Sequence, residues 1–298
     1  MRNVLVVGSV NMDLVTTVPK FPQPGETLIG EHFATYCGGK GANQAIAAAR
    51  LGAKVSLIGA VGDDDFGNQL RQNLQNDGVN IQGVKVVENS PSGVAVVMVS
   101  KGHNNIVVTR GANAFVCVED VLAHEKLFEQ ADVVLSQLEI PLDVVEAVAD
   151  LAEKYQKPFI LNPAPAKRLP KSLTHKVTLL TPNEHEFIVS LDLPHDTDIF
   201  SLFSYVSGQV VLTRGEQGAY FCKDGGLAEY QSGFQVDVVD STGAGDTFNG
   251  ALAVYYHLGL NEAVKRACAA GALSVTAHGA QTGMPTEETL LSFLAKTI

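Results

Sequence analysis

Short runs of β-branched residues alternate along the chain with segments of helical periodicity, and this alternation most constrains the fold. Runs such as residues 3–8 (NVLVVG), 54–62 (KVSLIGAVG) and 209–215 (QVVLTRG) are largely apolar without strict alternation. Strands that are buried on both faces of a parallel sheet have this pattern. Helical patterns lie between such runs, among them residues 65–78 and 141–155. The sequence therefore predicts an α/β fold, a doubly wound and mostly parallel sheet flanked by helices.

Two segments interrupt this alternation. Residues 14–37 are rich in Pro and Gly and contain strand-like pieces but no helical pattern. Residues 92–110 have the pattern of a β-hairpin that turns near residues 102–105. Both segments follow strands of the main sheet, so we expect them to form a small β-sheet that stands over one edge of the core as a lid. Residues 1–298 are predicted to form a single domain with this lid inserted.

The composition excludes several classes of protein. A hydrophobic content of 46% with only 18% charged residues argues against intrinsic disorder. A net charge of -11 argues against a nucleic-acid-binding surface, which needs clustered Lys and Arg. No stretch reaches the roughly 20 apolar residues of a membrane span, and the first apolar run is too short for a signal peptide. The four scattered cysteines read as free thiols, so we expect a cytoplasmic protein without membrane or nucleic-acid partners.

Residues 237–252 (DVVDSTGAGDTFNGAL) place a carboxylate beside a glycine turn at the start of a helical pattern. Gly243 and Gly245 allow several backbone N–H groups to converge at the first helical turn, which is a site for an anion. A base next to an anion site suits phosphoryl transfer to an alcohol, because the base takes the hydroxyl proton while the amides stabilise the phosphoryl group. Alternatively, Asp246 is an ordinary first-turn acid, with Ser241 or Thr242 as the N-cap.

The common nucleotide-binding motifs are absent from the sequence. The stretch CGGKGAN (residues 37–43) has a glycine after the lysine and so is not a Walker A motif, and GAGDTF (residues 243–248) lacks the third glycine of the dinucleotide fingerprint. The eight histidines show no metal-ligand spacing. The chemistry must therefore be sought in a different arrangement of residues.

Several stretches, in the same order along nearly the whole chain, resemble the signatures of the ribokinase-like, or phosphofructokinase-B, family of sugar kinases. They are SVNMDL (residues 9–14), GGKGANQA (38–45), LNPAPA (161–166), TPNEHE (181–186), DSTGAGD (240–246) and GAQ (279–281). The resemblance is closest to the family members that act on ribose. It implies ATP-dependent phosphorylation of the ribose 5-hydroxyl to give ribose 5-phosphate.

The resemblance also implies roles for individual residues. Asp246 would be the catalytic base, and the backbone of Gly243, Ala244 and Gly245 would form the anion hole. The sugar would be held by Asn11, Asp13, Gly39, Lys40, Asn43, Glu139 and Asp246. Asn183 and Glu186 would organise Mg²⁺ and phosphate, and Thr213, Gly215, Gly218 and Gly245 would contact ATP. A monovalent cation, K⁺, would be held by Asp240, Thr242, Ser274, Ala277, Gly279 and Gly283.

Simpler interpretations remain for single residues, with Lys40 as a solvated loop residue, Asn43 as a helix cap and Glu139 as a turn acid. Two alternatives to a ribose kinase also remain. One is a kinase for another sugar or a nucleoside (deoxyribose, fructose, adenosine or pseudouridine), and the other is a catalytically silent sensor of sugar or nucleotide. The segment of residues 187–208 is shorter and less helical than the corresponding segment of most family members. This departure affects the expected packing against the adenine of ATP.

The lid segment GVAVVMV (residues 93–99) is apolar on both sides of its predicted strand, with Val94, Val96 and Met98 on one side and Ala95, Val97 and Val99 on the other. A lid that covers a sugar with one face leaves the other face exposed, and soluble monomers avoid such patches. We therefore expect a homodimer in which two lids pack together.

Overall fold

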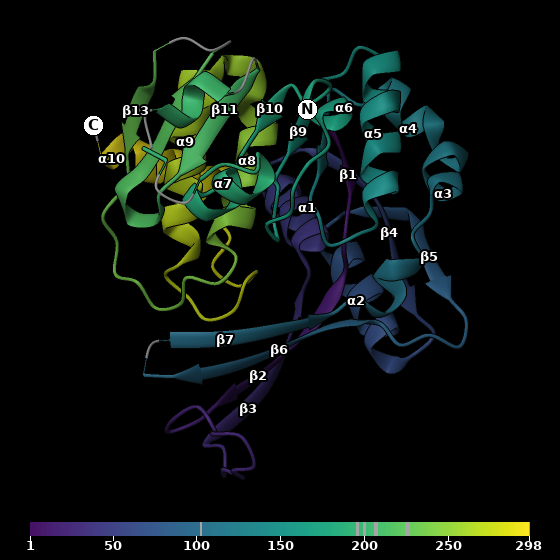
Figure 1. Ribbon diagram of the computed structural model, residues 1–298, viewed down its shortest axis with the longest axis vertical. Helices are drawn as coiled ribbons and strands as arrows, with labels where there is room; N and C mark the ends of the chain where they lie inside the picture. Colours follow the sequence, from purple (N-terminus) through teal and green to yellow (C-terminus); the bar gives the residue numbers. More distant parts are fainter. Residues whose placement is uncertain (102, 195–196, 199–200, 206–207, 224–226, 298) are drawn as a thin grey trace.

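The structure is a computed structural model that describes residues 1–101, 103–194, 197–198, 201–205, 208–223 and 227–297. In this part of the chain the main sheet has nine strands in the order β13-β12-β11-β10-β9-β8-β1-β4-β5 (Figure 1). Neighbouring strands from β5 to β11 are parallel, and β12 and β13 are antiparallel. The strands are β1 (Asn3–Val7), β4 (Lys54–Gly62), β5 (Asn80–Val87), β8 (Val133–Ser136), β9 (Phe159–Leu161), β10 (Leu179–Leu180), β11 (Gln209–Thr213), β12 (Gly218–Cys222) and β13 (Glu229–Ser232). The predicted doubly wound α/β fold is confirmed.

Helices cover both faces of this sheet. One layer contains α1 (Lys40–Arg50), α2 (Asp65–Asn76), α8 (Ala244–Tyr255), α9 (Leu260–Ser274) and α10 (Glu287–Lys296). The other contains α3 (Val118–Ala123), α4 (Glu125–Gln130), α5 (Leu142–Lys154), α6 (Lys171–Thr174) and α7 (Glu184–Ser190). Short 3₁₀ turns complete the described part: η1 (Gly111–Phe115), η2 (Ser201–Tyr205), η3 (Gly215–Gln217) and η4 (Tyr256–Leu258).

Strand β1 shows why its sequence run lacks alternation. Val4 and Val6 pack into the core on the side of α1 and α8, whereas Leu5 and Val7 pack into the core on the side of α5. Because successive side chains point to opposite faces, a strand covered on both sides must be apolar at every position.

Helix α8 lies directly against α1, and a glycine permits this close approach. A Cβ atom added at Gly250 would lie 2.7 Å from the Cβ of Ala47 and 2.7 Å from the carbonyl oxygen of Gln44. A side chain at this position would therefore push the helices apart. The contact brings the first turn of α8 next to the first turns of α1, although about 200 residues separate them.

The lid is a four-stranded sheet in the order β3-β2-β6-β7 that extends away from the main body (Figure 1). Its strands are β2 (Asn11–Thr17), β3 (His32–Gly38), β6 (Gly93–Ser100) and β7 (His103–Thr109). The expected lid is confirmed, but β2 begins at Asn11 rather than near residue 14. Strand β1 ends at Val7, so Asn11 and Asp13 lie on the lid and not at the end of a main-sheet strand. Part of the expected hairpin turn, residue 102, lies outside the described residues.

Two other local expectations need correction or completion. Helix α1 begins at Lys40 and has Gly39 as its N-cap, so Asn43 is a residue of the helix and not its cap. In the segment 187–208, α7 ends at Ser190 and η2 follows, while residues 195–196, 199–200 and 206–207 are outside the described part. Among the described helices, none combines the length and hydropathy that a bilayer span requires.

Candidate active site

The start of helix α8 is formed by a glycine turn. Gly243 is the N-cap, in the left-handed conformation with a φ of 78°, and no side chain caps the helix. The alternative N-caps Ser241 and Thr242 are therefore wrong, and the Thr242 hydroxyl donates instead to Asp240 Oδ1 at 2.7 Å. The backbone N–H of Ala244 donates to the Ser241 carbonyl at 3.3 Å, within the turn. A Cβ atom added at Gly245 would meet no atom within 4 Å, so space lies open beside the second residue of the helix.

The Asp246 carboxylate lies in the first turn of α8 and is held by two side-chain amides from α1. Asn43 Nδ2 donates to Asp246 Oδ2 at 2.9 Å, and Gln44 Nε2 donates to Asp246 Oδ1 at 2.9 Å. The residue is only 7% exposed. Each carboxylate oxygen thus accepts a hydrogen bond from a fixed donor, which sets the orientation of the whole group.

A second buried carboxylate, Glu139, follows β8. Its Oε2 atom accepts hydrogen bonds from the Ser9 hydroxyl, from Asn11 Nδ2 at 3.3 Å and from the backbone N–H of Lys40 at 3.3 Å. Glu139 is 8% exposed. Because it joins the base of the lid to the first turn of α1, it is not a solvated turn acid.

Charges of both signs meet in the space between these groups. Burial and the carboxylates of Glu139 and Asp246 raise the pKa of Asp13 to about 7, against the effect of the Lys40 amine. Burial lowers the pKa of Lys40, but the surrounding carboxylates, led by Asp246 and Glu139, raise it to a net value above its ordinary one. Burial also raises the pKa of Glu186, against a backbone hydrogen bond from Asn183 and the charge of Lys40. Lys40 is therefore the cation that several acids share and not a solvated loop residue.

The sequence interpretation assigned no role to several residues that organise this site. Asn113, in η1, donates from Nδ2 to Asn11 Oδ1 at 2.8 Å and accepts from the Val10 backbone N–H at 2.9 Å. Gln44 and Gln281 lie inside the stretches GGKGANQA and GAQ. These stretches were the only indication in the sequence that the two residues belong to the site. Asn113 directly follows the hairpin and carried no separate signal.

Two loops meet at the carboxyl ends of β10 and β11. Asn183 caps α7: its side chain accepts from the Glu186 backbone N–H at 2.8 Å, while Glu186 Oε2 accepts from the Asn183 N–H at 2.9 Å. Asn183 also forms a bridge to Thr213. Gly215 and Gly218 both have positive φ values, in the turn that leads into β12. Thus five of the six residues expected on the nucleotide side, namely Asn183, Glu186, Thr213, Gly215 and Gly218, lie on two adjoining loops, and the sixth, Gly245, lies in the first turn of α8.

The six residues expected around a monovalent cation come from the loop before α8 and from the last residue of α9 with the loop that follows it, and these two segments are tied together. Asp240 Oδ2 accepts from the Gly279 N–H at 2.8 Å, and Asp240 Oδ1 accepts from the Thr242 N–H at 3.0 Å. A Cβ atom at Gly283 would lie 2.1 Å from the carbonyl oxygen of Ser274, so these backbones are in contact. Ala277 lies in the same connection, between Ser274 and Gly279. Within the described residues, no three His, Cys, Asp or Glu side chains form a metal-binding group.

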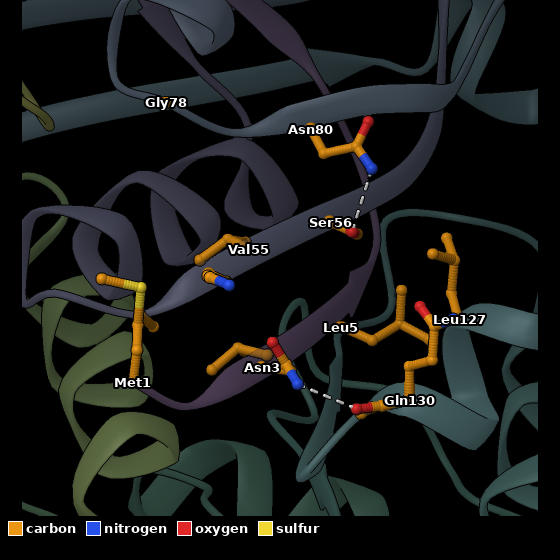
Figure 2. Close-up of a pocket in the computed structure, with 13 residues that line it drawn as sticks. Met1, Asn3, Leu5, Val55, Ser56, Gly78, Asn80, Leu127 and Gln130 are labelled. Atoms are coloured by element: carbon orange, nitrogen blue, oxygen red, sulfur yellow. Dashed lines mark hydrogen bonds between the residues drawn. The ribbon is translucent and has the colours of Figure 1, made fainter.

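A cavity of about 480 Å³ lies at the other end of the main-sheet strands, at the amino ends of β1, β4 and β5 (Figure 2). Three of its polar side chains are bonded: Asn80 Nδ2 donates to Ser56 Oγ at 3.3 Å, and Asn3 Nδ2 donates to the Gln130 backbone carbonyl at 3.1 Å. Ligands of doubly wound sheets bind at the carboxyl ends of the strands. The cavity is therefore not the site described above.

Comparison with known proteins gives the family. The model of the pfkB family of carbohydrate kinases matches residues 1–287. The chain belongs to this family. It is 42% identical over 297 residues to a ribokinase of Bacillus subtilis, covering 99% of this chain and 100% of the relative. It is also 35% identical over 304 residues to a deoxyribokinase of Salmonella typhi, covering 98% of this chain and 99% of that one.

Solved structures share the fold of this pfkB kinase. A ribokinase of Arabidopsis thaliana, solved in complex with ribose and ATP, superposes with a TM-score of 0.88 at 32% identity and 99% coverage of both chains. A ribokinase of Giardia lamblia gives a TM-score of 0.90 at 25% identity, with 100% of this chain and 99% of the other covered. The expected enzyme class, an ATP-dependent sugar kinase, is confirmed, and a catalytically silent sensor is not favoured.

Proposed function

We propose that the protein transfers the γ-phosphoryl group of ATP to the 5-hydroxyl of ribose. The observation that carries the proposal is the Asp246 carboxylate, held by Asn43 and Gln44 beside an open glycine turn at the start of α8. A base and an anion site next to each other are what phosphoryl transfer to an alcohol needs. The similarity to ribokinases over nearly the whole chain supports ribose as the alcohol.

In the proposed complex the sugar lies between the base of the lid and α1. Asn11, Asp13 and Glu139 approach from the lid side and from the end of β8, and Lys40 and Asn43 approach from α1. Carboxylates accept from vicinal hydroxyls, while the Lys40 amine donates to them. The Gly39 backbone packs against the base of the lid at the same place, because a Cβ atom there would lie 2.6 Å from the backbone nitrogen of Asn11.

Asp246 then accepts the proton of the 5-hydroxyl as that oxygen attacks the γ-phosphorus. The new O–P bond forms as the bond between the γ-phosphorus and the β–γ bridging oxygen breaks, and ADP leaves. The backbone N–H groups of Gly243 and Gly245 stabilise charge on the transferred group, joined by that of Ala244 when it leaves its 3.3 Å contact with the Ser241 carbonyl and supported by the positive end of the α8 dipole. The proton on Asp246 later passes to solvent.

ATP would lie across the loops that carry Asn183, Glu186, Thr213, Gly215 and Gly218, with Gly245 at its γ-phosphate. Carboxylate and amide oxygens are the ligands that Mg²⁺ accepts, so Asn183 and Glu186 fit an ion held largely through water. When bound, Mg²⁺ neutralises phosphate charge. K⁺ would be held by backbone carbonyls of Asp240, Thr242, Ser274, Ala277, Gly279 and Gly283, and the Asp240 carboxylate joins the two loops that supply them.

We also infer a homodimer that forms through the lid. Phe33, Val96 and Val107 lie on the lid face opposite Asp13 and are 62%, 41% and 61% exposed. A second copy of this surface would cover them, and a specific interface needs about 1,000 Å² or more in total. Val97 lies on the Asp13 face and is only 8% exposed, so Val96 is the better position at which to test the contact.

The second candidate is a deoxyribose kinase, because the chain is also 35% identical to deoxyribokinases over nearly its whole length. A coupled ADP-release assay over ribose, deoxyribose, fructose, adenosine and pseudouridine separates these candidates.

The test of the base is Asp246→Asn. We expect turnover to fall by roughly 10²–10⁴-fold, as when a general base is removed. The melting temperature should fall as well, because an amide accepts at only one of the two positions at which Asn43 and Gln44 donate, so turnover is measured where the variant is fully folded. Turnover within threefold of wild type would remove Asp246 from this role.

A further inference from the structure

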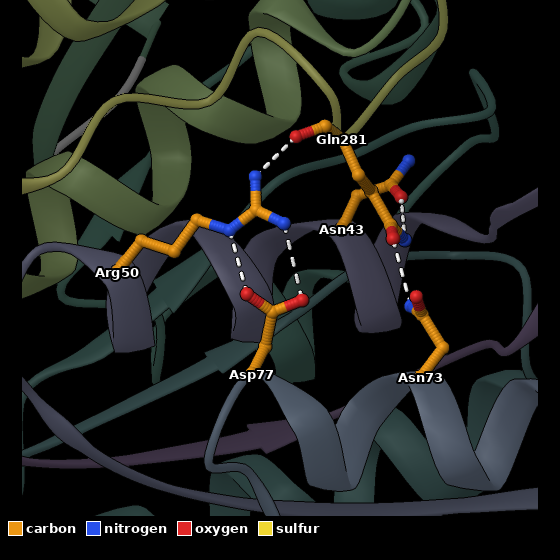
Figure 3. A network of polar contacts seen from close by, with 5 residues as sticks. All are labelled: Asn43, Arg50, Asn73, Asp77 and Gln281. Atoms are coloured by element: carbon orange, nitrogen blue, oxygen red, sulfur yellow. Dashed lines mark hydrogen bonds and ion pairs between the residues drawn. The ribbon is translucent and has the colours of Figure 1, made fainter.

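Side-chain amides form a chain that begins on α2, outside the proposed site, and ends on the Asp246 carboxylate. Figure 3 shows its links from Asn73 through Gln281 to Asn43. Asn73, in α2, donates from Nδ2 to Gln281 Oε1 at 2.9 Å. Gln281 Nε2 donates to Asn43 Oδ1 at 2.8 Å, and Asn43 Nδ2 donates to Asp246 Oδ2 at 2.9 Å. Every link runs in the same direction, from an amide NH₂ group to the oxygen of the next residue.

This direction matters because an amide has a donor end and an acceptor end. If the Asn43 amide rotated by half a turn, its oxygen would face an oxygen of Asp246, and its NH₂ group would face the NH₂ group of Gln281. Both contacts would then be repulsive. The side chains of Asn43, Asp246 and Gln281 are all buried, so water could not replace the lost hydrogen bonds. The Asp246 carboxylate, which only accepts, and the Gln281 NH₂ group, which donates, therefore hold the Asn43 amide from its two ends.

Gln281 is itself fixed from two sides. The Arg50 guanidinium donates to the Gln281 backbone carbonyl and pairs with Asp77 in a two-pronged contact, at 2.6 Å and 3.1 Å. Arg50 is the last residue of α1, and Asp77 directly follows α2. The loop that carries Gln281 is thus bound to the ends of both helices, and the residue is only 8% exposed.

The other oxygen of Asp246, Oδ1, also accepts from a chain of side-chain amides, but none of them belongs to the loop that carries Gln281. Gln137 Nε2 donates to Gln44 Oε1 at 2.6 Å, and Gln44 Nε2 donates to both Asp246 Oδ1 at 2.9 Å and Asn162 Oδ1 at 3.1 Å. The two amide chains approach the carboxylate on separate oxygens, so the loss of one leaves the other in place.

We propose that Gln281 is a positioning residue for phosphoryl transfer: it orients the Asn43 amide and, through it, the Asp246 carboxylate. This inference rests on the proposed function, because it assumes that Asp246 is the base. Gln281 lies between Gly279 and Gly283, so the same loop that is proposed to hold the cation also sets the geometry of the base.

The experiment is a double-mutant cycle between Gln281 and Asn43. Gln281→Met keeps much of the side-chain volume and removes both amide contacts. We expect kcat to fall about 10- to 100-fold, the range in which a small misplacement of reacting groups acts. In an Asn43→Ala background, the same substitution is expected to change kcat less than about twofold, because the residue that transmits the effect is already gone.

Gln72→Met is the matched control. Gln72 is an exposed residue of α2 whose amide donates to Asn76 Oδ1, one helical turn away, at 2.9 Å. We expect it to keep wild-type kcat. Should Gln281→Met lower the folded fraction in a thermal melt, Asn73→Ala removes the preceding link at a half-buried position and is expected to lower kcat at least threefold, again only when Asn43 is present.

Two results would overturn the inference. One is a kcat for Gln281→Met within twofold of wild type, and the other is an equal loss in the wild-type and Asn43→Ala backgrounds, which would indicate a general structural role. Asp246→Asn distinguishes failure of the proposed function: if that variant is active the base assignment falls, and if it is inactive while Gln281→Met is normal, only the positioning role falls.

Discussion

Asp13, which is proposed to hold the sugar, is expected to reduce the stability of the folded protein. Burial, together with Glu139 and Asp246, raises its pKa from an ordinary 3.8 to about 7, while Lys40 opposes the change. The folded protein therefore holds this proton at pH values at which the unfolded chain has released it. A carboxyl group with a raised pKa destabilises the folded state increasingly as the pH rises from about 4 to about 7, and the cost stays constant above that.

The magnitude follows from the difference between the two pKa values, 3.8 and about 7. At 1.36 kcal/mol for each pKa unit, the full cost above pH 7 is about 4 kcal/mol, of which about 2.5 kcal/mol develops between pH 5 and pH 8. Asp13 is half-buried, so solvent screening reduces the change in stability between pH 5 and pH 8 to about 1–2 kcal/mol.

Asp13→Asn removes the charge and keeps the size of the side chain. Relative to wild type, we expect the variant to be about 1–2 kcal/mol more stable against unfolding at pH 8 than at pH 5, while sugar binding weakens. Urea unfolding of both proteins at the two pH values gives this difference, and calorimetric titration with ribose gives the affinity.

Asp64→Asn is the control for this comparison. Burial opposes the change, but hydrogen bonds from Ser92 and Gly67 lower the pKa of Asp64. Its stabilising contribution is therefore complete above its ordinary pKa of 3.8 and is lost only as the pH falls toward the lowered value. The cost of Asp64→Asn should be the same at pH 5 and pH 8. A stability difference for Asp13→Asn that is also the same at both pH values would refute the reasoning.

Three further predictions concern substrate, cation and assembly. Ribose should exceed 2-deoxyribose in kcat/KM, because a missing hydroxyl leaves buried polar groups unpaired; equal efficiency in the coupled assay would favour the deoxyribose alternative. K⁺ should activate turnover more than Na⁺ at equal ionic strength, because it would fix the loops of Asp240 and Gly279 beside the α8 turn; equal rates in K⁺, Na⁺ and a bulky organic cation would exclude this. Val96→Glu should shift the protein toward monomer in light scattering and weaken sugar binding, whereas a monomeric, fully active wild type at micromolar concentration would contradict the proposed dimer.

The sequence by itself determined the layers of the fold. Apolar runs without alternation, as in residues 3–8, could only be strands covered on both faces, and the finding that Val4 and Leu5 enter different cores bears this out. The two segments without helical pattern were correctly predicted as the lid. These features are local, because the periodicity of a short segment states how many of its faces are buried. Resemblance to the family then supplied the site residues, which periodicity does not reveal.

Only the tertiary structure decided how those residues meet. Asn43 and Asp246 are separated by 203 positions, and Gln281 and Asn43 by 238, so no local pattern links them. Their contact depends on the close packing of α8 on α1 at Gly250 and on the Arg50 contact that fixes the Gln281 loop. Likewise, Gly243 is the N-cap because its backbone has a left-handed φ. The order of Ser, Thr and Gly in the sequence does not show which of the three residues begins the helix. Sequence periodicity reports which faces are buried, whereas the direction of a hydrogen-bonded amide depends on what the folded chain brings to each of its ends.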